Sequence, residues 1–278
     1  MITPEMILFL IFLALGLGSA SWLYLGLGLY ADWWWFFVPI LATFGFFWVC
    51  FLLHIIMLFL TSFLINGNKE RTKANRFAMW MIHDTCFVLL IFLRVKVSMK
   101  GFDKLPKDKP FVIVSNHLSM FDQIVMLGKL RTTNIICISK PENFHIPIAG
   151  KWIQLAGYIA INRDNMAEGV SAIEKAKSYL RQGTSIYVCP EGTRAKDHEL
   201  QPFHHGTFRL VCDEGFDLAV CAIRGTWRIK EGVMLFAHHV YYELIDHIEG
   251  AKLKGRATDE VAEASHNAIA EYLAGWLI

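Results

Sequence analysis

The amino-acid sequence predicts an α/β fold, with a largely parallel sheet flanked by helices, preceded by an N-terminal membrane helical hairpin. Two observations support this prediction. From residue 95 onward, short apolar runs alternate with segments of helical periodicity, as in layered folds built on parallel strands. Before Lys69, the 278-residue chain carries only two formal charges, Glu5 and Asp32. We therefore expect a membrane hairpin (1–68), an interfacial or docking helix (69–94) and a cytoplasmic α/β domain (95–278).

The hairpin is predicted from two charge-free segments, residues 6–31 and 33–68. Each is longer than the ~20 apolar residues that cross a bilayer core. A cleaved signal peptide is disfavoured, because no positive charge precedes the apolar run and that run is too long. A hairpin that enters one leaflet and returns has similar hydropathy, so it stays an alternative.

Positive charge follows the second apolar segment and is absent from the turn between the two segments. Lys69, Arg71, Lys73 and Arg76 come directly after it, whereas residues 30–35 contain no Lys or Arg. Lysine and arginine are concentrated on the cytoplasmic side of membranes. We therefore expect the rest of the chain to lie in the cytoplasm.

A third apolar stretch, residues 77–93, is interrupted by His83 and Asp84 and flanked by arginines. Ionisable residues make a free transmembrane span unfavourable there, so we expect an interfacial or docking helix. Residues 94–109 then carry six Lys or Arg against two Asp. Such a surface attracts anionic headgroups or phosphorylated substrates, although an ordinary solvated surface has the same composition.

Short apolar runs bounded by turn residues predict the strands of the α/β domain. A polar connection separates the first two runs, and Pro190 ends the fifth. The predicted strands are 95–99, 111–114, 133–139, 158–161, 185–189, 218–223 and 234–242.

Helical periodicity and capping residues predict three helices in the same domain. The first is opened by Ser119 as N-cap, with Asp122 at the third helical position, and runs to about residue 129. The second covers residues 166–181, where apolar residues recur at helical spacing before Gly183. The third begins at Thr258 as N-cap, with two acids in its first turn, and runs to about residue 277.

A histidine and a carboxylate follow the second predicted strand. His117 and Asp122 are five residues apart, so on a regular helix their side chains would point about 140° apart. They can meet only if the backbone turns between them, and a helix that starts at Ser119 provides that turn. A neutral imidazole accepts a proton from an alcohol, and a carboxylate orients the ring and stabilises the imidazolium. A solvated turn histidine beside an ordinary helix-start aspartate is the alternative.

Two further turns follow predicted strands, where α/β folds collect their binding residues. Arg163 leaves the strand at 158–161, placed for a bidentate grip on a phosphate. In residues 190–194, Gly192 lets the backbone approach a ligand closely, and Thr193 and Arg194 add a hydroxyl and a cation. Ordinary turn chemistry explains each segment taken alone.

Cysteine and histidine usage argues against disulfides and structural metal. The six cysteines contain no C-x-x-C pair and lie mostly in apolar runs, as expected of buried free thiols in a reducing compartment. The adjacent pairs His204-His205 and His238-His239 have no ligand partners at zinc-like spacing. We therefore predict no metal site.

The co-occurrence and order of three motifs resemble the 1-acyl-sn-glycerol-3-phosphate (lysophosphatidic acid) acyltransferase family, in the phospholipid/glycerol acyltransferase superfamily. The motifs are Asn116-His117-x4-Asp122, residues 157–163 and residues 190–194, and the resemblance covers roughly residues 90 to 230. Lys140-Pro141-Glu142 also resembles the family. The sequence departs from the family pattern at Ala160, where an aromatic is usual, at Ala195, where Ser is frequent, and at Cys221, near a common proline.

This resemblance implies a glycerolipid acyltransferase-like fold and an enzyme without cofactor. His117, oriented by Asp122 and supported by Asn116 and Ser119, would deprotonate the sn-2 hydroxyl of lysophosphatidic acid. The hydroxyl would attack acyl-CoA or the acyl thioester of acyl carrier protein and give phosphatidic acid for phospholipid biosynthesis. The residues implied in acceptor phosphate binding are Arg163, Glu191, Gly192, Thr193, Arg194 and Lys140.

The expected partners are membrane lipids, the lysolipid and the acyl donor, with no nucleic acid. The expected location is the bacterial inner membrane, with the catalytic domain in the cytoplasm.

Two alternatives to this function stay open. The acceptor could be another lysolipid, in phospholipid remodelling or as a lyso-aminolipid. A lipid-binding membrane protein with an inactive acyltransferase fold is the non-enzymatic alternative, and the intact His117 and Asp122 argue against it. A serine hydrolase is disfavoured, because the sequence has no G-x-S-x-G motif.

Overall fold

The computed structural model describes residues 14–19, 21–22, 24–28, 37–67, 69, 71–131, 133–162, 165–195, 199–231 and 237–275. The chain forms two compact units, Met1–Ile65 and Asn66–Ile278.

The first unit contains one long apolar helix, α2 (Phe37–Ser62). Its 26 residues correspond to about 39 Å of helix, enough to cross the hydrocarbon core of a bilayer. Among the described residues it is the one helix that is long and apolar enough to do so. The preceding segment is described only in short helical pieces within 14–28, and the predicted turn at 30–35 lies outside the described residues. The hairpin therefore stays a prediction.

The second unit is built on a seven-stranded sheet of order β1-β7-β6-β2-β5-β3-β4. All neighbouring strands are parallel except β6 and β7, so β1 and β7 run opposite to the other five. The prediction of a largely parallel sheet is confirmed. The strands are β1 (Val95–Lys100), β2 (Phe111–Ser115), β3 (Ile135–Ser139), β4 (Ile159–Ala160), β5 (Ser185–Val188), β6 (Asp217–Arg224) and β7 (His238–Ile248).

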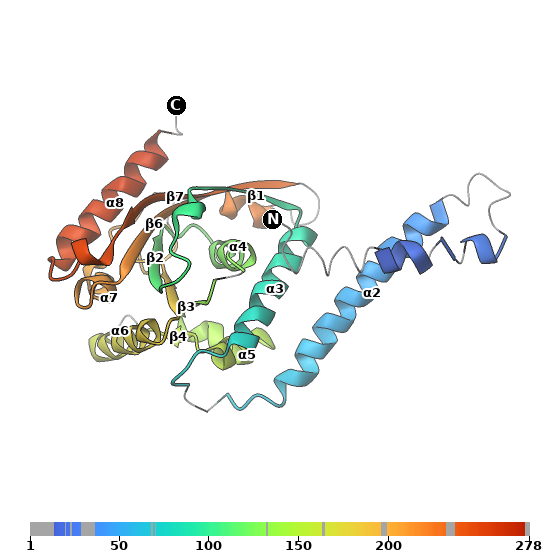
Figure 1. The fold of residues 1–278 in the computed structure, drawn as a ribbon, viewed down its shortest axis with the longest axis horizontal. Helices are drawn as coiled ribbons and strands as arrows, with labels where there is room; N and C mark the ends of the chain where they lie inside the picture. Colours follow the sequence, from blue (N-terminus) through green and yellow to red (C-terminus); the bar gives the residue numbers. More distant parts are fainter. Residues whose placement is uncertain are drawn as a thin grey trace. The chain divides into compact units, whose positions relative to one another are not determined.

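Helices cover both faces of this sheet (Figure 1). On one face α3 (Arg76–Phe92) packs against α4 (Phe121–Lys129) and α5 (Ala149–Ala156). On the other face lie α6 (Met166–Arg181), α7 (Arg209–Cys212) and α8 (Thr258–Ala274). Short 3-10 helices complete the unit: η3 (Phe102–Lys104), η4 (Pro141–His145), η5 (His205–Phe208), η6 (Thr226–Glu231) and η7 (Gly250–Lys252).

The core lies along the central strands. Every residue of β2, β3 and β5 is buried, because both faces of these strands are covered by helices. This explains why the three strands appear in the sequence as continuous apolar runs instead of alternating ones. The edge strand β1 alternates between half-buried and exposed residues.

The elements α5, β7 and α8 differ from the sequence prediction. The helix α5 was not predicted, because it has only eight residues and begins after Ile148, a β-branched residue at φ 64° that is no helix signal. The strand predicted at 234–242 is β7 at His238–Ile248, half-exposed and rich in polar residues, while residues 232–236 lie outside the described residues. In α8 the N-cap is Ala257, and Thr258 is the first helical residue.

Candidate active site

The predicted site residues that the structure describes lie at the carboxyl edge of the parallel strands. His117 follows β2, Lys140 follows β3 and Glu191 follows β5. Because β2, β3, β5 and β6 run in the same direction, the turns after them meet at one edge of the sheet. This is the edge at which open α/β sheets bind their ligands.

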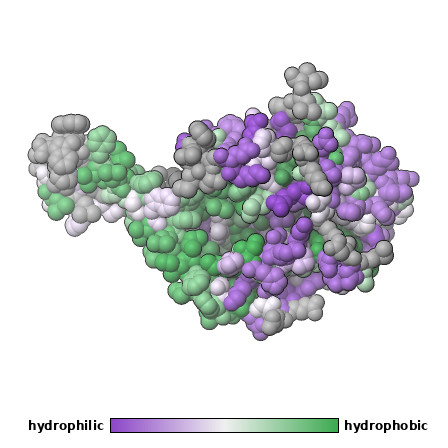
Figure 2. All heavy atoms as spheres, turned by 180° about the vertical axis from the view of Figure 1, so that it is seen from behind, coloured by the Kyte–Doolittle hydropathy of each residue, from purple (hydrophilic) through white to green (hydrophobic). Residues whose placement is uncertain are grey.

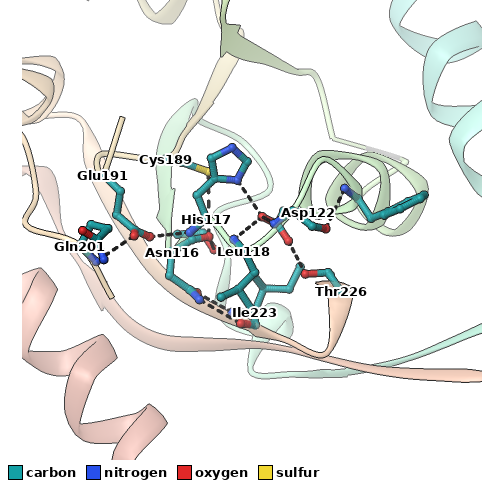
Figure 3. A network of polar contacts seen from close by, with 12 residues as sticks. Asn116, His117, Leu118, Asp122, Cys189, Glu191, Gln201, Ile223 and Thr226 are labelled. Atoms are coloured by element: carbon teal, nitrogen blue, oxygen red, sulfur yellow. Dashed lines mark hydrogen bonds and ion pairs between the residues drawn. The ribbon is translucent and has the colours of Figure 1, made fainter. Parts of the chain in front are cut away.

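His117 and Asp122 form a hydrogen-bonded pair in the turn after β2. The Nδ1 atom of His117 lies 2.8 Å from Oδ2 of Asp122. A carboxylate only accepts hydrogen bonds, so Nδ1 carries a proton, and in the neutral form of the ring Nε2 holds the free lone pair. Figure 3 shows Nε2 on the side of the ring away from Asp122. Since the His117 side chain is 17% exposed and Asp122 is fully buried, Nε2 is the atom that can meet a substrate.

Asp122 accepts three further hydrogen bonds, which hold its carboxylate in place. Oδ2 also accepts the backbone N–H groups of Leu118, at 2.7 Å, and Ser119, at 2.9 Å. Oδ1 accepts the hydroxyl of Thr226, 2.5 Å away. Four donors therefore surround a fully buried carboxylate, and one of them is the imidazole. The arrangement pre-orients the imidazole in a single tautomer.

The turn that brings His117 and Asp122 together resembles a capping box that lies one residue before the start of the helix. The helix α4 begins at Phe121, with Met120 at the N-cap position, so the predicted N-cap at Ser119 is wrong by one residue. The Ser119 hydroxyl still accepts the N–H of Phe121 at 3.0 Å, and Asp122 reaches back to the N–H of Ser119. These reciprocal bonds turn the backbone before the helix, and this turn places Asp122 beside His117.

Asn116 and Glu191 fix the turn to the neighbouring strands. The amide of Asn116 donates to the carbonyl of Ile223 at 3.0 Å and accepts the N–H of Ile223 at 2.8 Å. Glu191, only 2% exposed, accepts the N–H of His117 at 2.5 Å and that of Gln201 at 2.9 Å. Burial raises the pKa of Glu191 to about 6. Sequence reasoning expected Glu191 to position an arginine or a hydroxyl, whereas the structure shows both oxygens on backbone N–H groups.

The structure gives the positions of four other residues expected at the acceptor phosphate. Thr193 and Arg194 are exposed after β5, and the next residue, Ala195, donates its N–H to the carbonyl of His117 at 2.7 Å. Gly192 adopts φ 77°, which favours glycine. Lys140 is exposed after β3. Arg163 lies outside the described residues, so its predicted role stays a prediction.

A match to known proteins extends over the same strands and turns. A model of the Acyltransferase family matches residues 96–224, a segment that contains β2 to β6, all of β1 but its first residue, and the His117–Asp122 pair. Residues 96–224 are therefore similar to the Acyltransferase family, and we call the second unit, which contains them, the acyltransferase domain.

Curated relatives of the acyltransferase domain carry one activity in their names. The 1-acyl-sn-glycerol-3-phosphate acyltransferase LPAT1 of Arabidopsis thaliana is 31% identical over 179 residues, which are 61% of this chain and 49% of the relative. The 1-acyl-sn-glycerol-3-phosphate acyltransferase BAT2 of Brassica napus is 29% identical over 181 residues, which are 63% of this chain and 50% of the relative. The chain thus spans about half the length of these relatives.

A solved structure has a similar fold. The 1-acyl-sn-glycerophosphate acyltransferase PlsC of Thermotoga maritima superposes with a TM-score of 0.52 at 19% identity. The match covers 92% of this chain and 94% of that chain. At 19% identity, this similarity is evidence for a shared fold alone.

Sequence reasoning missed Thr226 in the acyltransferase domain. It is the second residue after β6, at the same edge as the other turns, and is fully buried against Asp122. The preceding Gly225 has φ 86°, and a Cβ there would lie 2.4 Å from the carbonyl oxygen of His239. A glycine followed by a hydroxyl residue directly after a predicted strand is the signal that points to it.

Proposed function

We propose that this protein is a membrane-bound acyltransferase that moves a fatty acyl group from acyl-CoA or acyl-ACP to the sn-2 hydroxyl of 1-acylglycerol-3-phosphate. The product is phosphatidic acid. The observation that carries the proposal is the His117–Asp122 pair, at 2.8 Å, on the carboxyl edge of the acyltransferase domain. The names of the relatives support lysophosphatidic acid as the acceptor.

The reaction follows from the geometry of the pair. Nε2 of His117 accepts the proton of the acceptor hydroxyl while the hydroxyl oxygen attacks the thioester carbonyl carbon. The C–S bond then breaks, and the thiolate leaves with the proton returned by the imidazolium. Asp122 stabilises the imidazolium between these steps, because its carboxylate is held 2.8 Å from Nδ1. The acyl group passes directly from thioester to hydroxyl, with no nucleophile from the protein.

The acceptor phosphate is bound by cations on the exposed side of the same edge. Arg194 and Thr193 follow Glu191, and Lys140 lies after β3. Arg163 is assigned to the same phosphate site from its sequence motif. A guanidinium gives a phosphate two parallel hydrogen bonds, so these arginines hold the headgroup and leave the hydroxyl to His117.

The membrane segment keeps the site close to its lipids. We propose that residues 1–68 form a hairpin in the bacterial inner membrane, with α2 as its second helix and the acyltransferase domain in the cytoplasm. The apolar length of α2 and the basic residues after it support this orientation. Both the lysolipid and its product then stay in the bilayer during turnover.

The test is the activity of the detergent-solubilised full chain on lysophosphatidic acid and on other lysolipids, with acyl-CoA and acyl-ACP as donors. Mass spectrometry of the product identifies the acceptor and the donor group. The variant His117→Ala should abolish transfer.

The chain offers a matched control in a second histidine–carboxylate pair. His247 lies 2.9 Å from Asp217, and Asp217 begins β6 at the opposite edge of the sheet. His247→Ala should keep its activity. Turnover that survives His117→Ala would contradict the proposal, and a preference for another lysolipid would move the acceptor to the remodelling alternative.

A further inference from the structure

The helix α3 presents an apolar stripe to solvent. Phe77, Trp80 and Ile91 lie on one side of the helix and are 61%, 41% and 39% exposed. The opposite side is buried and includes Met79 and Leu90. Large apolar side chains that stay exposed along one helix face, opposite a face already packed, mark a surface for another partner.

The aromatic end of this stripe packs against the buried Trp152 of α5. The ring centroids of Phe77 and Trp80 are 6.1 Å apart, and Phe77 lies 6.4 Å from Trp152 of α5. Figure 2 shows apolar side chains gathered on the side of this unit where Figure 1 places α3 and α5. The rest of the unit in this view is mostly hydrophilic. Tryptophan is enriched where a protein meets the headgroup region of a membrane.

The charges around the stripe favour an anionic surface. Arg76, the first residue of α3, is exposed, as are Lys69 and Lys73 in the segment before the helix. The acid within the stripe, Asp84, is paired with Arg131 at 2.5 Å, and the Arg131 guanidinium lies 3.9 Å above the ring of Phe87. The acid is therefore neutralised inside the unit, whereas Lys69, Lys73 and Arg76 are exposed on the surface.

We propose that the face of α3 formed by Phe77, Trp80 and Ile91, with Lys73 and Arg76 beside it, docks on an anionic lipid surface. This is a contact of the acyltransferase unit itself, separate from the apolar segment before it. Apolar side chains next to a cluster of basic ones are the pattern of helices that lie in the membrane interface. Docking holds the unit at headgroup depth, and only the choice of substrate in the test rests on the proposed function.

The kinetic test uses the full chain in vesicles of phosphatidylcholine with and without phosphatidylglycerol. In the phosphatidylglycerol vesicles, the double variant Phe77→Ser, Trp80→Ser should raise the apparent KM for lysophosphatidic acid at least ~5-fold, because each lost contact of this size changes interfacial binding by about that factor. With a short-chain lysophosphatidate dispersed in detergent, kcat and KM should equal those of the wild type. The charge variant Lys73→Glu, Arg76→Glu should remove the stimulation by phosphatidylglycerol.

A matched control is Val170→Ser on α6, an apolar residue that is 44% exposed away from this face. It should behave as the wild type on vesicles. Vesicle kinetics that are unchanged in the double variant, or changed equally by Val170→Ser, would overturn the proposal. A KM that rises equally in detergent would also overturn it.

A readout independent of turnover is hydroxyl-radical labelling of Trp80. Labelling should fall in phosphatidylglycerol vesicles relative to phosphatidylcholine vesicles, and the protection should disappear at high salt. Equal labelling in the two kinds of vesicle would overturn the docking proposal. A dimer in detergent that dissociates in the double variant would assign the face to a second copy of the chain instead. Labelling also tests docking if the wild type fails to acylate lysophosphatidic acid. The docking proposal and the proposed function can therefore fail separately.

Discussion

Replacing Thr226 with valine tests whether the carboxylate of Asp122 must be held from both sides. The substitution keeps the volume of the side chain and removes the hydroxyl that donates to Oδ1 at 2.5 Å. Asp122 is fully buried, so water cannot replace the lost donor. Hydrogen bonds to charged groups contribute roughly 1.5–3 kcal/mol. If that energy holds the carboxylate on His117, kcat should fall about 10- to 100-fold.

The assay compares kcat and KM for lysophosphatidic acid across two substitutions. Thr226→Val should lower kcat and leave KM for the acceptor nearly unchanged, because Thr226 contacts Asp122 and not the exposed cations. Thr226→Ser keeps the hydroxyl and should retain kcat within about threefold. A wild-type kcat in Thr226→Val, or an equal loss in Thr226→Ser, would refute the reasoning. A thermal unfolding midpoint, measured in detergent, separates misfolding from misalignment.

Three further outcomes are expected. Burial raises the pKa of Glu191 to about 6, above its ordinary value of 4.5, so the folded state binds the proton more tightly. The free energy of unfolding should therefore fall by about 2 kcal/mol in total as the pH rises from well below 4.5 to well above 6, and Glu191→Gln should flatten this part of the unfolding profile. Arg163→Ala and Arg194→Ala should mainly raise KM for the acceptor, and an effect confined to the acyl donor would contradict phosphate binding. Gly225→Ala should destabilise the protein by more than ~1 kcal/mol in thermal unfolding, because φ is 86° and the new Cβ would meet the carbonyl oxygen of His239.

Local sequence patterns were enough where local interactions decide the structure. The helix α6 covers the predicted residues 166–181, and the Asn165 side chain caps it by accepting the N–H groups of Ala167 and Glu168. The His117 turn was also predictable, because Ser119 and Asp122 bond to backbone groups within a few residues. Short elements without such signals, such as α5, were missed.

Contacts between distant residues were beyond the reach of the sequence. Thr226 and Asp122 are 104 residues apart, and Asn116 and Ile223 are 107 apart. The carboxylate of Glu191 had been expected to hold a side chain, yet it accepts the N–H of a residue 74 positions away. Nothing in the local pattern of either segment records these partners.

The alternation of strands and helices, the apolar segment before them and the pairing of His117 with Asp122 could all be predicted from local sequence. Each depends on periodicity, charge or capping within a few residues. The strand order, the opposite direction of β1 and β7, and the groups after β5 and β6 that immobilise the pair follow from the folded chain as a whole. The physical reason is that the parallel sheet brings the ends of strands distant in sequence to one edge, where burial forces each polar group to find a partner.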